Sequence, residues 1–195
     1  MKTTKLCIAF IALCLCATAY SQSNKKTSTA ERFKTEYSNS NPENKSFGCA
    51  YLADPDPNGC NVREKPKGKV IKVLSTQQEW MIDLREAWNG WFRIGPIIET
   101  GEDENIDLKT DNCWIHGSLL GASTRNYGNQ TLRFYTHPNT KSKVVFTVSE
   151  EDSAVTFIDI RPGWTKVQYT DDKGKKLTGW IETEWLCCNP YTTCS

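Results

Sequence analysis

The sequence predicts an all-β protein made of two similar units, each of a size that folds into a small β-barrel. From Phe47 onward, short runs of β-branched and aromatic residues are interrupted by Gly, Pro, Asn and Asp, and no stretch keeps a 3.6-residue apolar period. Landmark segments occur twice in the same order, in units with room for about five strands each. The mature chain also has an even number of cysteines, which suits small cores that need disulfide staples.

The N-terminus predicts export. Lys2 and Lys5 precede an apolar run, Leu6–Ala19, that is too short to span a bilayer and is followed by small and polar residues. This order is typical of a secretory signal peptide, and we expect residues 1–21 to be removed. A lipoprotein signal is the alternative, although the cysteines of this segment follow Leu where an acylated cysteine needs a small neighbour.

Cleavage leaves a nearly neutral chain. Residues 1–21 hold two of the 24 Lys and Arg and none of the 23 Asp and Glu, so 22 basic and 23 acidic side chains remain. Such a chain, with no basic patch, argues against nucleic acid as a partner, and no later run is long enough for a membrane span. Residues 22–46 are polar and charged, which predicts a disordered leader before the two units, 47–122 and 128–195.

Six of the nine cysteines remain in the mature chain and predict a disulfide set: Cys49, Cys60, Cys113, Cys187, Cys188 and Cys194. No Cys-x-x-Cys pair is present, which disfavours the alternative of a zinc site. Cys49 and Cys60 flank a segment rich in turn residues, which favours their pairing. Cys194 can fold back onto Cys187 or Cys188, which leaves Cys113 for the other. Six cysteines allow fifteen connectivities, so peptide mapping has to decide.

The repeat consists of four landmarks in each unit. The first unit contains CNVREKP (Cys60–Pro66), GKVIKVL (Gly68–Leu74), NGWFRI (Asn89–Ile94) and CWIHGSLLG (Cys113–Gly121). The second contains LRFYTHP (Leu132–Pro138), SKVVFTV (Ser142–Val148), PGWTKV (Pro162–Val167) and GWIETEWLC (Gly179–Cys187). The interval from Val70 to Trp91 nearly equals that from Val144 to Trp164, as a duplicated unit requires.

These landmarks resemble the bacterial SH3-like (SH3b) domain, which shows an Asn-Val-Arg-x-x-Pro segment, a Gly-Trp-x-x-Val strand and a closing Gly-Trp-Val/Ile strand. The tail EWLCCNPYTTCS resembles that of exported SH3-domain proteins from Bacteroides-like bacteria. The resemblance implies two SH3-like β-barrels in tandem. It also implies a non-catalytic module that binds peptidoglycan or a cell-envelope protein, in the periplasm or outside the cell. The alternatives are an inhibitor or immunity protein that covers the active site of a secreted toxin or wall hydrolase, and an unrecognised hydrolase.

Strand parity places a tryptophan and a cation on the same face in each unit. Residues two apart in a strand share a face, so Trp91 lies with Arg93, opposite the apolar residues of its strand. Trp164 likewise lies with Lys166. Each tryptophan is either a lid over a loop or an exposed binding platform, and the SH3 resemblance favours the platform. We expect Trp80, Trp88, Tyr135 and Tyr169 as flanking residues and Trp114 and Trp180 as structural ones.

No constellation of residues predicts catalysis, a cofactor or a metal. His116 and His137 fall in different units, and neither lies beside a nucleophile in a recognised motif. The acidic loop between the third and fourth landmarks of the first unit lacks the spacing of an EF-hand and predicts a solvated insertion. It contains Glu99, Glu102, Asp103, Glu104, Asp107 and Asp111.

Overall fold

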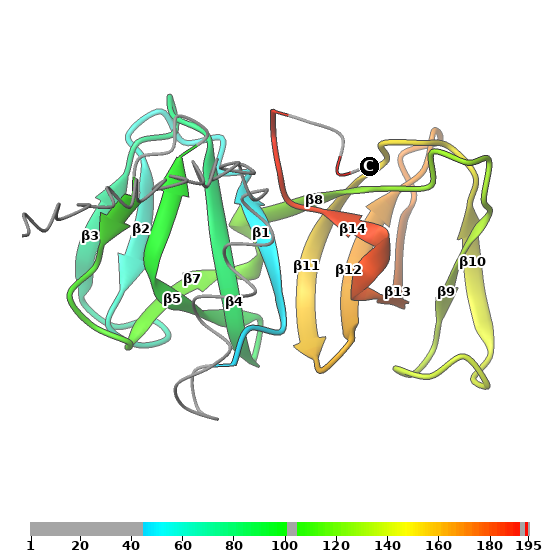
Figure 1. Ribbon diagram of the computed structural model, residues 1–195, viewed down its shortest axis with the longest axis horizontal. Helices are drawn as coiled ribbons and strands as arrows, with labels where there is room; N and C mark the ends of the chain where they lie inside the picture. The colour runs from blue at the N-terminus through cyan, green and yellow to red at the C-terminus, as the bar shows by residue number, and fades with distance from the viewer. Residues whose placement is uncertain (1–44, 101–104, 192–193, 195) are drawn as a thin grey trace, which may run out of the picture.

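The computed structural model describes residues 45–100, 105–191 and 194, and this part of the chain is nearly all β (Figure 1). The expected signal peptide and almost all of the expected leader lie outside the described residues. The strands are β1 (Gly48–Leu52), β2 (Cys60–Arg63), β3 (Val70–Leu74), β4 (Trp80–Trp88), β5 (Trp91–Thr100), β6 (Asn105–Asp107), β7 (Cys113–His116), β8 (Leu120–Thr124), β9 (Leu132–Tyr135), β10 (Val144–Val148), β11 (Ala154–Arg161), β12 (Trp164–Thr170), β13 (Lys176–Glu182) and β14 (Leu186–Cys187). Short 3-10 helices follow β7 and β13, and no helix in the described ranges is long and apolar enough to cross a membrane.

All pairings in the sheet are antiparallel, as expected for an all-β chain without crossover helices. The strands follow the order β10-β9-β13-β12-β11-β8-β1-β4-β5-β7-β2-β3, while β6 pairs with β5 and β14 pairs with β8. In the described residues this order is one open sheet with β10 and β3 at its edges. The prediction of an all-β fold is therefore confirmed, whereas two closed barrels are not seen in the strand pairing.

The repeat reappears as an identical pattern of hydrogen-bonded register. In the first unit Trp91 lies opposite His116 and Arg93 opposite Trp114, and in the second Trp164 lies opposite Glu182 and Lys166 opposite Trp180. Both β2–β3 and β9–β10 carry a bulge at the second residue of the second strand, opposite the last two residues of the first strand. A one-residue slip in register would turn every side chain of a strand to the other face of the sheet. Because the register agrees, corresponding residues of the two units point to the same face.

Different turns begin the two tryptophan strands. Asn89 and Gly90 both have positive φ, at 48° and 78°, which is the type I′ geometry of a two-residue hairpin. In the second unit Pro162 precedes Gly163, whose φ of 76° suits position i+2 of a type II turn. The Gly-Trp phrase therefore arises because both turns need a left-handed glycine directly before the strand that carries the tryptophan.

Strand β8 connects the two units and pairs within both. Its Gly121 lies opposite Tyr51 of β1 on one side and opposite Thr156 of β11 on the other. Its Thr124 lies opposite Leu186 of β14. Figure 1 shows β8 running from the first group of strands to the second. In the first unit β8 extends the sheet beside β1. In the second unit it pairs with β11 as β1 pairs with β4 in the first.

The core is continuous across this junction. Phe92 of β5 and Phe157 of β11 meet edge to face, with ring centroids 5.9 Å apart, and both rings are almost completely buried. Edge-to-face contact is a favourable geometry for aromatic pairs and contributes about 0.5–1.5 kcal/mol beyond the area that it buries. The two units therefore stabilise each other through side-chain packing as well as through β8.

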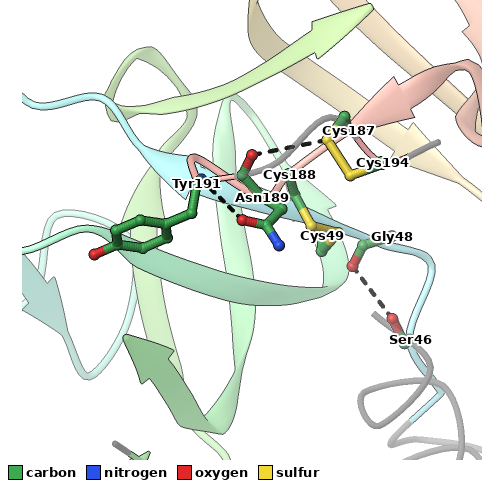
Figure 2. The surroundings of a disulfide bond; sticks show 8 residues. All are labelled: Ser46, Gly48, Cys49, Cys187, Cys188, Asn189, Tyr191 and Cys194. Atoms are coloured by element: carbon green, nitrogen blue, oxygen red, sulfur yellow. Dashed lines mark hydrogen bonds between the residues drawn. A yellow bond between two sulfur atoms is a disulfide. The ribbon is translucent and has the colours of Figure 1, made fainter. Parts of the chain in front are cut away.

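Two disulfides fasten the C-terminal tail (Figure 2). Cys49 of β1 bonds to Cys188, with Cα atoms 5.6 Å apart, and Cys187 bonds to Cys194 at 5.4 Å. The expectation that Cys194 folds back onto one of the two adjacent cysteines, and that these two have different partners, is confirmed. Disulfides persist in oxidising compartments, so these bonds indicate an exported protein.

The predicted Cys49–Cys60 pair and the assignment of Cys113 to a disulfide are wrong. Both Cys60 and Cys113 are free and buried. Three strands separate β1 from β2 in the sheet, so the turn-rich segment after Cys49 does not return the chain to it. The two free cysteines cannot bond to each other either. Arg63 lies opposite Trp114, which sets them about four residues, or about 13 Å, apart along neighbouring strands.

Candidate functional site

Burial confirms the predicted strand parity in the first unit. Phe92 and Ile94 are completely buried, whereas Trp91 and Arg93 lie on the opposite face and are partly exposed. The inward positions fill the core, so β5 is held by residues other than its tryptophan. Trp91 is thereby presented on the outer side of the sheet.

The second unit has the same arrangement. Thr165 and Val167 are completely buried, and Trp164 and Lys166 lie partly exposed on the other face. Thr165 makes a hydroxyl–hydroxyl hydrogen bond of 2.9 Å to Thr183, which satisfies a polar group inside the core. The position of both tryptophans is thus explained, while a role for them in binding stays a prediction.

The first tryptophan face consists of Trp88, Trp91, Arg93 and His116. Trp88 lies opposite Trp91 across the hairpin and is 55% exposed. The His116 ring stands edge-on to the Trp91 indole, with centroids 5.1 Å apart. Arg93 Nε donates to Glu86 Oε2 at 2.9 Å. An incoming acidic group therefore meets an arginine that already has a carboxylate neighbour, a point that the sequence did not reveal.

The second tryptophan face consists of Tyr135, Trp164 and Lys166. The Tyr135 ring stands edge-on to Trp164, with centroids 5.8 Å apart. Lys166 lies opposite Asp159, but Asp159 forms its ion pair with Arg161, at 3.1 Å. Within the described residues Lys166 has no salt bridge, so its ammonium group is the more available of the two cations.

The expected flanking residues divide into two groups. Trp88 and Tyr135 do lie beside the two tryptophans. Trp80 is buried, with its indole nitrogen donating to the Ser75 carbonyl at 2.7 Å, and Tyr169 has the opposite parity to Trp164. Sequence spacing could have excluded Tyr169, because it lies an odd number of residues, five, from Trp164 and so faces the other side of the strand. The burial of Trp80 could not be predicted without knowing that a strand begins at this residue. Both Trp114 and Trp180 are 7% exposed, as structural residues would be.

His116 also contacts a hydroxyl group, which the sequence analysis did not anticipate. Ser118 Oγ lies 2.8 Å from His116 Nδ1, and the Ser118 amide donates to the same nitrogen at 3.3 Å. The contact caps the 3-10 helix that begins at Gly117. In a catalytic triad a carboxylate accepts a hydrogen bond from one ring nitrogen of the histidine and orients the ring. Among the described residues no carboxylate is bonded to His116. His137 contacts the neighbouring Thr136 hydroxyl instead, at 3.1 Å.

The acidic loop lies partly outside the described residues, at 101–104 and in the side chain of Glu99. Of its described residues, Asp107 accepts hydrogen bonds from the amide and the ammonium group of Lys109, which lower the pKa of this carboxyl group. Asp111 lies 3.6 Å from the buried guanidinium of Arg85. Among the residues that the structure describes, no group of three His, Cys, Asp or Glu side chains is placed to hold a metal ion.

The two free thiols have raised pKa values, which make them unreactive core side chains. Burial, followed by the charge of Asp54, raises the pKa of Cys60 to about 12. Burial, followed by the charge of Asp111, raises the pKa of Cys113 to about 11. The thiolate is the nucleophilic form of cysteine, so both side chains behave as small core residues.

No family model matches the chain, and a search of curated proteins finds no match. Solved structures that it is similar to include NlpC2 from Trichomonas vaginalis, at 16% identity and a TM-score of 0.28, over 71% of this chain and 47% of that one. NlpC1 from the same organism aligns at 16% identity and a TM-score of 0.28, over 78% of this chain and 48% of that one. The aligned part thus spans about half the length of either structure. At these scores the likeness carries no argument about fold or activity.

Proposed function

We propose that this protein is a non-catalytic, exported binding module whose two tryptophan faces recognise peptidoglycan or a protein of the cell envelope. In this proposal each unit is an SH3-like barrel, as its landmarks suggest. The observation that carries the proposal is the repetition of one outward-facing arrangement in identical register. In each unit a partly exposed tryptophan precedes a cation by two residues, and a second aromatic ring contacts the indole edge to face.

Each tryptophan offers a large apolar surface whose motion is restricted by a neighbouring ring. Tryptophan presents a large, rigid apolar surface at little entropic cost, and it is enriched among residues that dominate binding energy. His116 and Tyr135 restrict the two rings by edge contacts, which lowers the ordering cost of binding. Lys166 adds a cation suited to a carboxylate of a peptide stem or of a partner protein.

Two equivalent faces on one chain also favour an extended or repeating ligand. Once one face is bound, the second binds at a raised effective concentration, provided that the ligand spans both. The disulfides place the protein in an oxidising compartment, and we propose the periplasm or the extracellular space.

The proposal is tested by sedimentation with purified sacculi, run beside a pull-down from the native envelope. Trp91→Ala and Trp164→Ala should each weaken binding by about 1–3 kcal/mol, the cost of truncating an interfacial hot spot. The control is Tyr191→Ala, because Tyr191 is a 50%-exposed aromatic residue of the tail, outside both faces. Unchanged binding by both tryptophan variants would overturn the assignment. A tight one-to-one complex with an enzyme whose active site is covered would instead favour an inhibitor.

A further inference from the structure

The structure contains a cleft that neither tryptophan face uses. It has a volume of about 430 Å³ and lies across four neighbouring strands, β12, β11, β8 and β1, where the two units join. Because β8 belongs to both units, this cleft exists only in the assembled chain and has no counterpart in a single unit.

A straight row of paired residues forms the centre of the cleft. Tyr51 lies opposite Gly121, Gly121 opposite Thr156, and Thr156 opposite Gln168. The residues that alternate with this row point into the core: Ala50, Ala122, Val155 and Val167 are all buried. The row therefore faces outward, on the side of the sheet opposite the core.

An aromatic ring packed over a glycine and an exposed alanine shape the cleft. A Cβ on Gly121 would lie 2.4 Å from Tyr51 Cε2, so the missing side chain lets the tyrosine ring lean over β8. Ala154 also lines the cleft and is exposed. Tyr51 thus covers Gly121 and forms an aromatic wall of the cleft, while Ala154 contributes a small exposed side chain to its lining.

The charged residues that line the cleft are two carboxylates, beside neutral polar side chains. Glu150 and Asp172 are both exposed lining residues, and in the described part of the chain neither has an ion-pair partner. Among the residues that the structure describes, the lining includes no lysine, arginine or histidine. Burial, partly offset by the Ser123 hydroxyl and increased by Asp152, raises the pKa of Tyr51, so the phenol stays neutral near pH 7.

We propose that this cleft binds a primary ammonium group on a flexible chain, such as the side chain of a lysine residue in a peptide. The tyrosine ring attracts a cation through its electron-rich face, and carboxylates accept charge-assisted hydrogen bonds from an ammonium group. The trough accepts the apolar stem while Gln168 and Thr156 contact its peptide groups. The tryptophan faces carry cations and favour acidic groups, so this site is chemically distinct and independent of the function proposed above.

The test is an NMR titration of the whole disulfide-bonded protein with N-acetyl-lysine-N-methylamide. N-acetyl-norleucine-N-methylamide is the matched probe, because it lacks only the ammonium group. The amide signals of Gly121, Thr156 and Gln168 should shift saturably with the lysine probe. The norleucine probe should bind about tenfold more weakly, the effect of losing a cation–π contact and a charged hydrogen bond.

Substitutions distinguish binding in the cleft from nonspecific attraction of the probe to surface carboxylates. Glu150→Gln and Asp172→Asn should each weaken the lysine probe severalfold, whereas Glu151→Gln, a neighbouring exposed carboxylate that does not line the cleft, should leave it unchanged. Ala154→Tyr should abolish binding by filling the trough, with the fold verified by the unshifted core signals. Equal affinity for the two probes, equal loss in the Glu151 control, or no saturable shift at these amides would each overturn the proposal.

Discussion

The Cys49–Cys188 disulfide closes a loop of 139 residues, and its removal should have the largest effect on stability of any change in the tail. The perturbation is the double substitution Cys49→Ser and Cys188→Ser, which leaves no unpaired thiol from this bond. In the chain-entropy treatment, a loop of this length restricts the unfolded chain by about 5 kcal/mol at 25 °C. That is a large part of the 5–15 kcal/mol by which a typical domain is stable.

The second disulfide is an internal control. Cys187 and Cys194 are separated by seven residues, for which the same treatment gives about 2.5 kcal/mol. The matched variant is Cys187→Ser with Cys194→Ser. It also removes two sulfur atoms but leaves β1 tied to the chain after β14.

Urea unfolding followed by fluorescence measures both variants. We expect the long-loop variant to lose about 5 kcal/mol and the short-loop variant about half as much. The long-loop variant should also show a larger dependence on urea, because its unfolded chain expands further and exposes more surface. Equal losses in the two variants would refute the reasoning from loop length. A loss below about 1 kcal/mol in the long-loop variant would show that this bond does not limit the unfolded state.

Three further predictions follow from burial and chemistry. Cys60 and Cys113, with pKa values of about 12 and 11, should not react with a thiol reagent at about pH 8 until urea exposes them, and rapid labelling of the native protein would contradict this. Phe92→Ala should cost about 3–5 kcal/mol of stability and Trp91→Ala less than ~2 kcal/mol, as urea unfolding measures; equal costs would make the tryptophan a core residue. Incubation with wall fragments or peptides should give no turnover, and turnover lost in His116→Ala would identify an enzyme.

The direction of side chains within a strand could be predicted from the sequence, because it depends only on neighbouring residues. Alternation in NGWFRI and PGWTKV predicts which of Trp91, Phe92, Trp164 and Thr165 face the core, and burial agrees at each. The repeat spacing likewise predicts equivalent positions, which the cross-strand register shows. In both cases a period of two and a turn glycine are enough to fix the answer.

Long-range pairing was not readable. The turn-rich segment after Cys49 suggested a local disulfide, but the sheet order puts three strands between Cys49 and Cys60, and Cys188 bonds to Cys49 instead. The sharing of β8 between the units was also missed, because no sequence period marks a strand that pairs on both sides. The cleft beside Tyr51 depends on that sharing and so could not be anticipated.

The most direct test of the central claim is fluorine NMR of protein labelled with 5-fluorotryptophan, which reports on all seven indoles separately. The probes are soluble fragments released from sacculi and a soluble extract of envelope proteins, each added in turn. We predict that the signals of Trp91 and Trp164 shift with one of these probes, while that of Trp80, which is buried and belongs to neither tryptophan face, stays in place. A shift confined to Trp80, or binding that leaves Trp91 and Trp164 unmoved, would contradict the central claim.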